Sequence, residues 1–266
     1  MSCPARSASG WSYGGIFRPG QPPLPANWRH LPVGYHGRAG TVVVSGTPIT
    51  RPNCQRRDPE GTVTFGPSTA LDFEAEIGFV VGTPSALGRP VPLIDFANHV
   101  FGVCLVNDWS ARDIQFWEYV PPSRDPYPLP YLDDSGTEPW GFDITLEVRL
   151  NGQLVSRPPF AGMYWTPAQQ LAHLTSNGAC LRTGDLFASG TVSGAAPDER
   201  GSLLELSWNG SAPLTLADGT TRSFLADGDE VSITAAAPGP EGTSIGLGVV
   251  YGRISLALVD EDAPRG

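Results

Sequence analysis

The most informative absence in this 266-residue sequence is lysine, because all 17 basic residues are arginine. Arginine and lysine are not interchangeable in catalysis, so no lysine amine can serve in a reaction here. Charged residues of both signs are also sparse, at 17%, and the formal net charge is −10. The sequence shows no basic stripe of the kind that nucleic-acid binders carry, and we therefore expect no nucleic-acid partner.

Cysteine and long apolar runs are equally scarce. The four cysteines form no CxxC pair, and Cys104 and Cys180 lie in apolar runs, where we expect them to be small core residues. No apolar stretch approaches the length of a membrane span, and no signal peptide is evident. These absences predict a cytoplasmic protein without a membrane partner.

Glycine and proline, in contrast, are abundant, with 32 and 27 residues spread along the chain without a period. This composition favours a fold rich in strands and turns over a helical bundle. Hydrophobic residues make up 40% of the chain, which suits one large globular domain. Residues 1–27 mix small residues and proline without a pattern, whereas the sequence from Trp28 onwards is orderly. We expect an atypical N-terminal segment at 1–27 and a domain at 28–266.

Local patterns predict several elements of secondary structure. We expect strands at 41–44, 71–81, 99–107 and 142–150, the last followed by a hairpin turn at Asn151-Gly152. A short helix is expected within 92–100, another at 111–119 with Ser110 as its N-cap, and the clearest one within 164–177 with Thr166 as its N-cap. Residues 51–66 read as a loop. The remainder reads as turns and short strands, the segment SLLELSW at 202–208 included.

Three carboxylates are the candidate metal ligands. Glu74 and Glu76 are two apart in an expected strand, so their side chains point to one face, where two negative charges repel unless they are neutralised. Asp108 ends an apolar run just before an expected helix. A hard divalent cation takes such oxygen ligands. A solvated strand face for the glutamates, and a helix-capping role for Asp108, remain open on these residues alone.

Longer motifs resemble a known family. The strings WRHLPVGYHGRAGTVVVSGTPI, LDFEAEIGF, NDWSARDIQFWEYVP, FASGTVSG and GSLLELSWNG are similar, in order, to the fumarylacetoacetase family, from Trp28 to about Leu258. The resemblance implies a β-rich α+β fold, a mixed β-sandwich roll of the family's C-terminal domain type. It also implies a homodimer that hydrolyses a carbon–carbon bond of 4-fumarylacetoacetate, a small diketo acid, to fumarate and acetoacetate in tyrosine and phenylalanine catabolism.

The same resemblance implies roles for individual residues. Glu74, Glu76 and Asp108 would bind Mg²⁺ or Ca²⁺, and Glu205 would be the catalytic carboxylate that orients a histidine base. A metal ion could act as Lewis acid and template for the two oxygens of a β-diketone. The substrate would contact five residues: Arg18, Tyr35, Gln115, Tyr119 and Thr191.

The sequence departs from the family in three places. We expect the family's N-terminal barrel domain to be absent. Spacing back from Arg18 places Ser2 and Ser9 where the family has a fourth metal carboxylate and the histidine base, and serine replaces neither. A family segment that carries an oxyanion-stabilising lysine is reduced to Pro122 and Ser123. We therefore expect weakened metal affinity and very low turnover.

Two other functions remain possible on the sequence. One is a related acylpyruvate hydrolase, which shares the carboxylate triad. The other is a non-catalytic metal-binding homologue or a truncated gene product. The long strings around WSARDIQ and LPYL favour the tyrosine-pathway enzyme.

Overall fold

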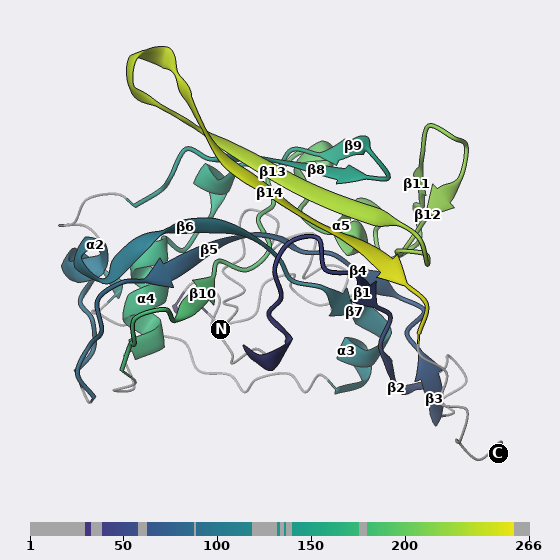
Figure 1. Cartoon of the computed structure of the whole chain (residues 1–266), viewed down its shortest axis with the longest axis horizontal. Coiled ribbons are helices and arrows are strands. Elements are labelled where there is room, and N and C mark those ends of the chain that lie inside the picture. Colours follow the sequence, from purple (N-terminus) through teal and green to yellow (C-terminus); the bar gives the residue numbers. More distant parts are fainter. Residues whose placement is uncertain are drawn as a thin grey trace.

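The computed structural model (Figure 1) describes residues 30–32, 39–57, 63–87, 89–118, 132–133, 136, 140–175 and 180–257, with the backbone alone at 54–57, 63–65 and 117–118. The strands are β1 (Ile49–Thr50), β2 (Asn53–Arg57), β3 (Val63–Pro67), β4 (Leu71–Asp72), β5 (Ala75–Val81), β6 (Val100–Asn107), β7 (Ser110–Ala111), β8 (Thr145–Leu150), β9 (Gln153–Ser156), β10 (Leu186–Ala188), β11 (Leu214–Thr215), β12 (Thr221–Arg222), β13 (Glu230–Pro238) and β14 (Ser244–Ser255). The α-helices are α2 (Phe96–His99), α3 (Arg112–Glu118), α4 (Pro167–Thr175) and α5 (Leu203–Leu206). Short 3₁₀ helices are η1 (Ala39–Thr41), η2 (Leu93–Asp95), η4 (Phe160–Gly162), η5 (Pro197–Glu199) and η6 (Pro240–Gly242).

Two sheets form the body of the fold. The larger has the order β1-β14-β13-β8-β9, in which β1 runs parallel to β14 and the other pairs are antiparallel. The smaller has the order β10-β5-β6 and is antiparallel throughout. The larger sheet lies across the smaller one, with β14 in contact with β6. Helix α4 lies on the other side of the small sheet, and α2, which contacts α4, lies at the end of β6 (Figure 1). This layered, strand-rich arrangement agrees with the predicted mixed β-sandwich roll.

The core fills the space between these layers. Phe79 of β5 is at its centre, fully buried, with its ring stacked on Phe187 at a centroid distance of 5.1 Å and close to three further rings, those of Phe96, Phe142 and Phe160. The side chains of β8 that face the core are buried in strict alternation, as a strand with one apolar face requires. β5 is thus a buried core strand, and the candidate carboxylates Glu74 and Glu76 lie at its N-terminal end.

Several predicted elements are confirmed. The strand expected at 71–81 appears as β4 and β5, interrupted at Phe73 and Glu74, and the strand at 99–107 appears as β6. Asn151 and Gly152 both have positive φ, at 52° and 79°, which is the backbone of the predicted tight hairpin turn. Helix α4 begins at Pro167, and the Thr166 hydroxyl accepts from the Gln169 amide as its N-cap.

Five predictions of local structure are wrong, and the fifth is that for the segment SLLELSW. The β-branched residues at 42–44 form no strand, because the edge of β14 near them is bonded by Gly46 and β1 instead. The polar stretch at 51–66 is not only loop, since β2 and β3 pair within it. Ser110 lies in β7, and α3 begins only at Arg112. Cys180 is exposed, although Cys104 is half-buried.

The segment SLLELSW holds helix α5 in place of a strand. Ser202 caps it locally, because its hydroxyl oxygen accepts from the Glu205 amide at 3.3 Å. The other free amides of its first turn, those of Leu203 and Leu204, donate to the carboxylate of Asp72, 131 and 132 residues away. A local pattern cannot contain that second partner, which explains why the prediction failed.

Candidate metal centre and the residues around it

The site is built on the junction between β4 and β5. Glu74 forms an isolated bridge with Ser202, and Glu76 is the second residue of β5. The amide of Asp108 donates to the Glu74 carbonyl at 3.0 Å, so the end of β6 is fixed directly beside Glu74. The backbone ladder between β5 and β6 therefore determines how the three carboxylates face one another.

Glu74, Glu76 and Asp108 form a compact acidic cluster. One carboxylate oxygen from each lies within 4.8 Å of the others. Glu76 is fully buried, and neither of its carboxylate oxygens has a hydrogen bond of good geometry, although the Gly190 backbone amide still lowers its pKa. Burial, and then the charges of Asp108 and Glu74, raise the pKa of Glu76 well above its ordinary value. A divalent cation with oxygen ligands would neutralise a buried, poorly hydrogen-bonded carboxylate that faces two others.

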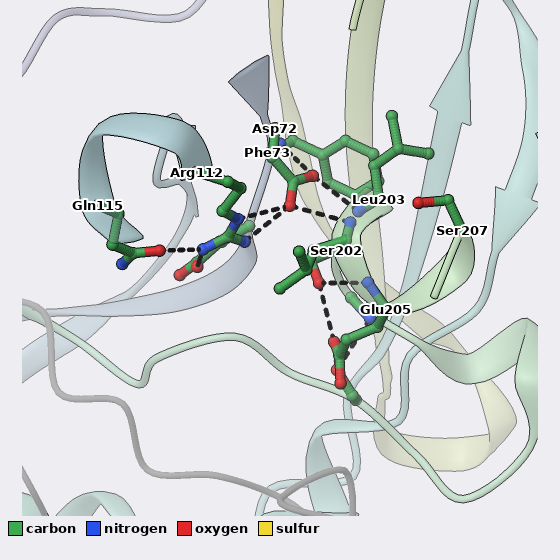
Figure 2. A network of polar contacts seen from close by, with 12 residues as sticks. Asp72, Phe73, Arg112, Gln115, Ser202, Leu203, Glu205 and Ser207 are labelled. Carbon is green, nitrogen blue, oxygen red and sulfur yellow. Dashed lines mark hydrogen bonds and ion pairs between the residues drawn. The ribbon is translucent and has the colours of Figure 1, made fainter. Parts of the chain in front are cut away.

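Arg112, the first residue of α3, holds one of these ligands. Its Nη1 lies 2.6 Å from Oε1 of Glu74 and also donates to Oε1 of Gln115 at 3.0 Å. The Arg112 side chain is fully buried, and its Nε and Nη2 lie 2.8 and 2.7 Å from Oδ2 of Asp72. One guanidinium thus joins a candidate metal ligand, a candidate substrate contact and a second buried carboxylate (Figure 2).

Asp72 accepts hydrogen bonds from the Arg112 side chain and from backbone amides. Besides Arg112, it receives the amides of Leu203 at 2.7 Å, Leu204 at 3.0 Å and Phe73 at 2.8 Å. Burial is the largest effect and leaves the pKa of Asp72 above its ordinary value, although the charge and hydrogen bonds of Arg112 lower it. Because every one of these contacts is a donor to Asp72, the side chain fits as a carboxylate and not as a protonated acid.

Glu205 lies on α5, whose N-cap residue Ser202 forms a bridge with Glu74 of the cluster. It is fully buried, and the hydroxyls of Ser193 and Ser202 donate to its Oε2 at 2.8 and 3.0 Å. Arg200 donates to its carbonyl at 2.9 Å. The two hydroxyls fix the orientation of the carboxylate, which is what a residue that orients a proton-transferring group requires.

The structure brings most of the described candidate residues together. Thr191 precedes Val192, whose amide donates to the Ala75 carbonyl, so the Gly-rich turn runs alongside the start of β5 between Glu74 and Glu76. Gln115 is tied to Glu74 through Arg112. Arg18, Tyr35 and Tyr119 lie outside the described residues, as do Ser2, Ser9, Pro122 and Ser123.

Sequence reasoning missed Asp72, Arg112 and Asn107. Asp72 continues the period-two pattern of Glu74 and Glu76 backwards along the chain, and Arg112 precedes Gln115 by three residues on one helix; both signals were available. Asn107 gave none. Its Oδ1 accepts from the Glu74 amide at 3.2 Å, and its Nδ2 is buried without a hydrogen-bond partner.

Comparison with known proteins decides the family. The family model described as fumarylacetoacetate (FAA) hydrolase C-terminal matches residues 17–254. This chain belongs to the fumarylacetoacetate hydrolase family. The human protein named fumarylacetoacetase is 46% identical over 281 aligned positions, which cover 92% of this chain and 66% of the human one. The protein of that name from Arabidopsis thaliana is 43% identical, covering 90% of this chain and 65% of its own length.

Solved structures support the fold of the family. A putative fumarylacetoacetate isomerase/hydrolase from Oleispira antarctica superposes with a TM-score of 0.52 at 18% identity, covering 84% of this chain and 82% of that one. This chain has the fold of the family. It spans slightly less than two thirds of the length of human fumarylacetoacetase. Among the described residues, no helix is both long and apolar enough to cross a membrane.

Proposed function

We propose that the chain is a fumarylacetoacetase-like hydrolase, which cleaves a carbon–carbon bond of 4-fumarylacetoacetate in tyrosine and phenylalanine catabolism. The observation that carries the proposal is the buried Glu76 carboxylate, which has no hydrogen bond of good geometry and faces Glu74 and Asp108 within 4.8 Å. Relatives named fumarylacetoacetase at 41–46% identity support the choice of substrate. We assign residues 28–266 to the catalytic domain and 1–27 to an atypical N-terminal segment.

The three carboxylates would hold Mg²⁺ or Ca²⁺, which supplies a Lewis acid and a template for the two oxygens of a diketone. Hydrolysis adds a water oxygen to one carbonyl carbon and gives a proton to the carbon that departs. Because Arg112 occupies Oε1 of Gln115, the amide nitrogen of Gln115 is the end available to donate to a substrate oxygen. Glu205 would orient the group that moves the proton.

We propose that Ser9 occupies the family's histidine position, as the spacing back from Arg18 indicates, and that turnover is slow for that reason. General bases contribute about 10²–10⁴-fold in rate. Ser9→His should therefore raise turnover by about 100-fold or more, whereas Ser7→His, two positions away, should leave it unchanged. Equal rates in both variants would show that position 9 is not where the base belongs.

The central experiment follows substrate loss by ultraviolet absorbance beside calorimetric titration with Mg²⁺ and Ca²⁺. The proposal predicts hydrolysis that stops on chelation and resumes with metal, and that is lost in Glu76→Gln. Metal binding without any hydrolysis of 4-fumarylacetoacetate would refute the hydrolase assignment and favour a non-catalytic metal-binding protein. Faster turnover of an acylpyruvate than of 4-fumarylacetoacetate would reassign the substrate.

We further propose a cytoplasmic homodimer. Large apolar side chains are exposed along β6 and β14, for example Phe101 at 84% and Ile245 at 53%, and a groove lined by Val103, Phe142 and Leu247 lies between these strands. Contiguous apolar surface of this kind marks protein interfaces. Sedimentation should give twice the mass of the chain, and Phe101→Asp should reduce it to the monomer. A monomeric parent chain would contradict the proposal.

A further inference from the structure

Two parts of the candidate site come from distant segments. The metal half consists of Glu74 and Glu76 at the start of β5 and Asp108 just after β6, and the other half is Glu205 on α5. One buried side chain, Asp72, contacts elements of both halves (Figure 2). Its Oδ2 binds the guanidinium that holds Glu74, and its two oxygens accept the first two amides of α5.

We infer that Asp72 is a positioning residue that couples the geometry of the metal ligands to the placement of Glu205. The inference rests on the proposed metal site and names a residue that acts through Arg112 and α5, without touching metal or substrate itself. Asp72 is fully buried, which fixes it in place and makes its contacts strong.

The first arm of the coupling is electrostatic. Arg112 is buried between two carboxylates, Asp72 and Glu74. When Asp72 is ionised, its negative charge partly neutralises the guanidinium of Arg112. Glu74 therefore keeps more of its own negative charge for binding a cation. Without that offset, the whole Arg112 charge would face Glu74 and compete with the metal ion. Partners of metal ligands typically change metal affinity by about 10- to 100-fold when they are substituted.

The second arm is mechanical. Helix α5 has a single turn, so its position depends on what holds its N-terminus. Asp72 provides that hold through Leu203 and Leu204, and Glu205 is the next residue of the helix. A shift of Asp72 would therefore move the Glu205 carboxylate relative to its Ser193 and Ser202 donors.

The test is Asp72→Asn, with Asp229→Asn as the matched control. Like Asp72, Asp229 is a buried carboxylate that binds one arginine and accepts a backbone amide. Its partners, Arg222 and Ala226, are not residues of the candidate site. We expect Asp72→Asn to weaken Mg²⁺ and Ca²⁺ binding by about 10-fold or more in calorimetry. Asp229→Asn should lower the unfolding midpoint and leave metal affinity within about twofold of the parent. Equal metal affinity in the two variants would overturn the inference.

A measurement on the unaltered chain covers the case in which Asp72→Asn does not fold. Hydrogen exchange at the amides of Leu203 and Leu204 should slow when Mg²⁺ is added, and should slow by a larger factor than exchange at Ala226. Equal slowing at all three amides would report only global stabilisation and would overturn the coupling. The charge-preserving Asp72→Glu should recover part of the lost affinity.

These outcomes separate the inference from the hydrolase proposal. A parent chain that binds metal, shows the Asp72 effect and hydrolyses nothing would refute only the hydrolase proposal. A parent chain that binds neither Mg²⁺ nor Ca²⁺ would overturn the metal site and the coupling together.

Discussion

Removal of one buried charge, by Glu76→Gln, is expected to stabilise the metal-free protein and to abolish its response to metal. Glu76 is fully buried and neither oxygen has a hydrogen bond of good geometry, so its ionised form is unfavourable in the folded chain. A glutamine of the same shape carries no charge, and its amide can donate to the carboxylates of Glu74 and Asp108.

The magnitude follows from the distance between the carboxylates. Two unit charges at the 4.8 Å that bounds the cluster repel by about 3 kcal/mol at an effective dielectric constant of about 20. Asp108 is the neighbour whose charge acts most strongly on Glu76, and Glu74 contributes a smaller repulsion. We expect Glu76→Gln to raise the free energy of unfolding by about 3 kcal/mol at pH 8 in the presence of a chelator.

The raised pKa of Glu76 determines how the stability difference between parent and variant changes with pH. The pKa of Glu76 in the folded chain lies above its ordinary 4.5, so the folded state binds the proton more tightly. The metal-free parent therefore loses stability as pH rises from about 4.5 through the folded pKa, and the variant lacks this loss. The two should be equally stable near pH 4 and should diverge towards pH 8.

Urea unfolding followed by circular dichroism, at several pH values with and without Mg²⁺, measures this difference. Metal at about 100 times its dissociation constant should stabilise the parent by about 2.7 kcal/mol and the variant not at all. A variant that is less stable than the parent at pH 8 in chelator would refute the reasoning, as would equal stabilisation of both by metal.

Three further substitutions probe the fold and α5. Phe79→Ala should lower the free energy of unfolding by about 3–5 kcal/mol in urea titrations, because it empties the centre of the aromatic core; a loss below about 1 kcal/mol would contradict that placement. Although burial raises the pKa of Asp229, hydrogen bonds from Arg222 keep it below the ordinary 3.8. The stability lost in Asp229→Asn, about 3–5 kcal/mol above pH 4, should therefore shrink as acid titrates the parent; a pH-independent difference would refute this pairing. Ser202→Ala should cost about 1 kcal/mol as a lost helix cap and should lower kcat, because Glu205 loses a donor, while calorimetric metal affinity stays unchanged; an unchanged kcat would count against Glu205.

The sequence predicted the parts of this fold that local chemistry determines. The Asn151-Gly152 turn, the Thr166 cap and the two central strands each depend on residues that are neighbours in the chain, and each was found. The grouping of Glu74, Glu76 and Asp108 was also predictable, since a period-two pair and a strand end both point to one edge. Their role as metal ligands came from the family resemblance and stays a prediction.

What the sequence could not predict depends on contacts between distant segments. Helix α5 was taken for a strand because Asp72, which accepts its first amides, lies 131 residues upstream of Leu203. The exposed valines at 42–44 were taken for a strand because nothing local shows that β1 and Gly46 bond the neighbouring edge of β14. Propensity describes what a segment prefers alone, and tertiary partners override it at these places.

Contacts between chain neighbours and contacts between distant segments meet at one short strand, β4. Leu71–Asp72 pairs with Ser110–Ala111, and this pairing places Arg112 and Asp72 on the same side of the sheet edge. The next two residues carry the chain to Glu74, which bridges to Ser202 at the cap of α5. The four residues from Leu71 to Glu74 therefore contact the metal ligands, the buried arginine and the Glu205 helix. Substitutions in that stretch should disturb all three together, whereas substitutions in the β13–β14 hairpin should affect stability or assembly without changing metal affinity.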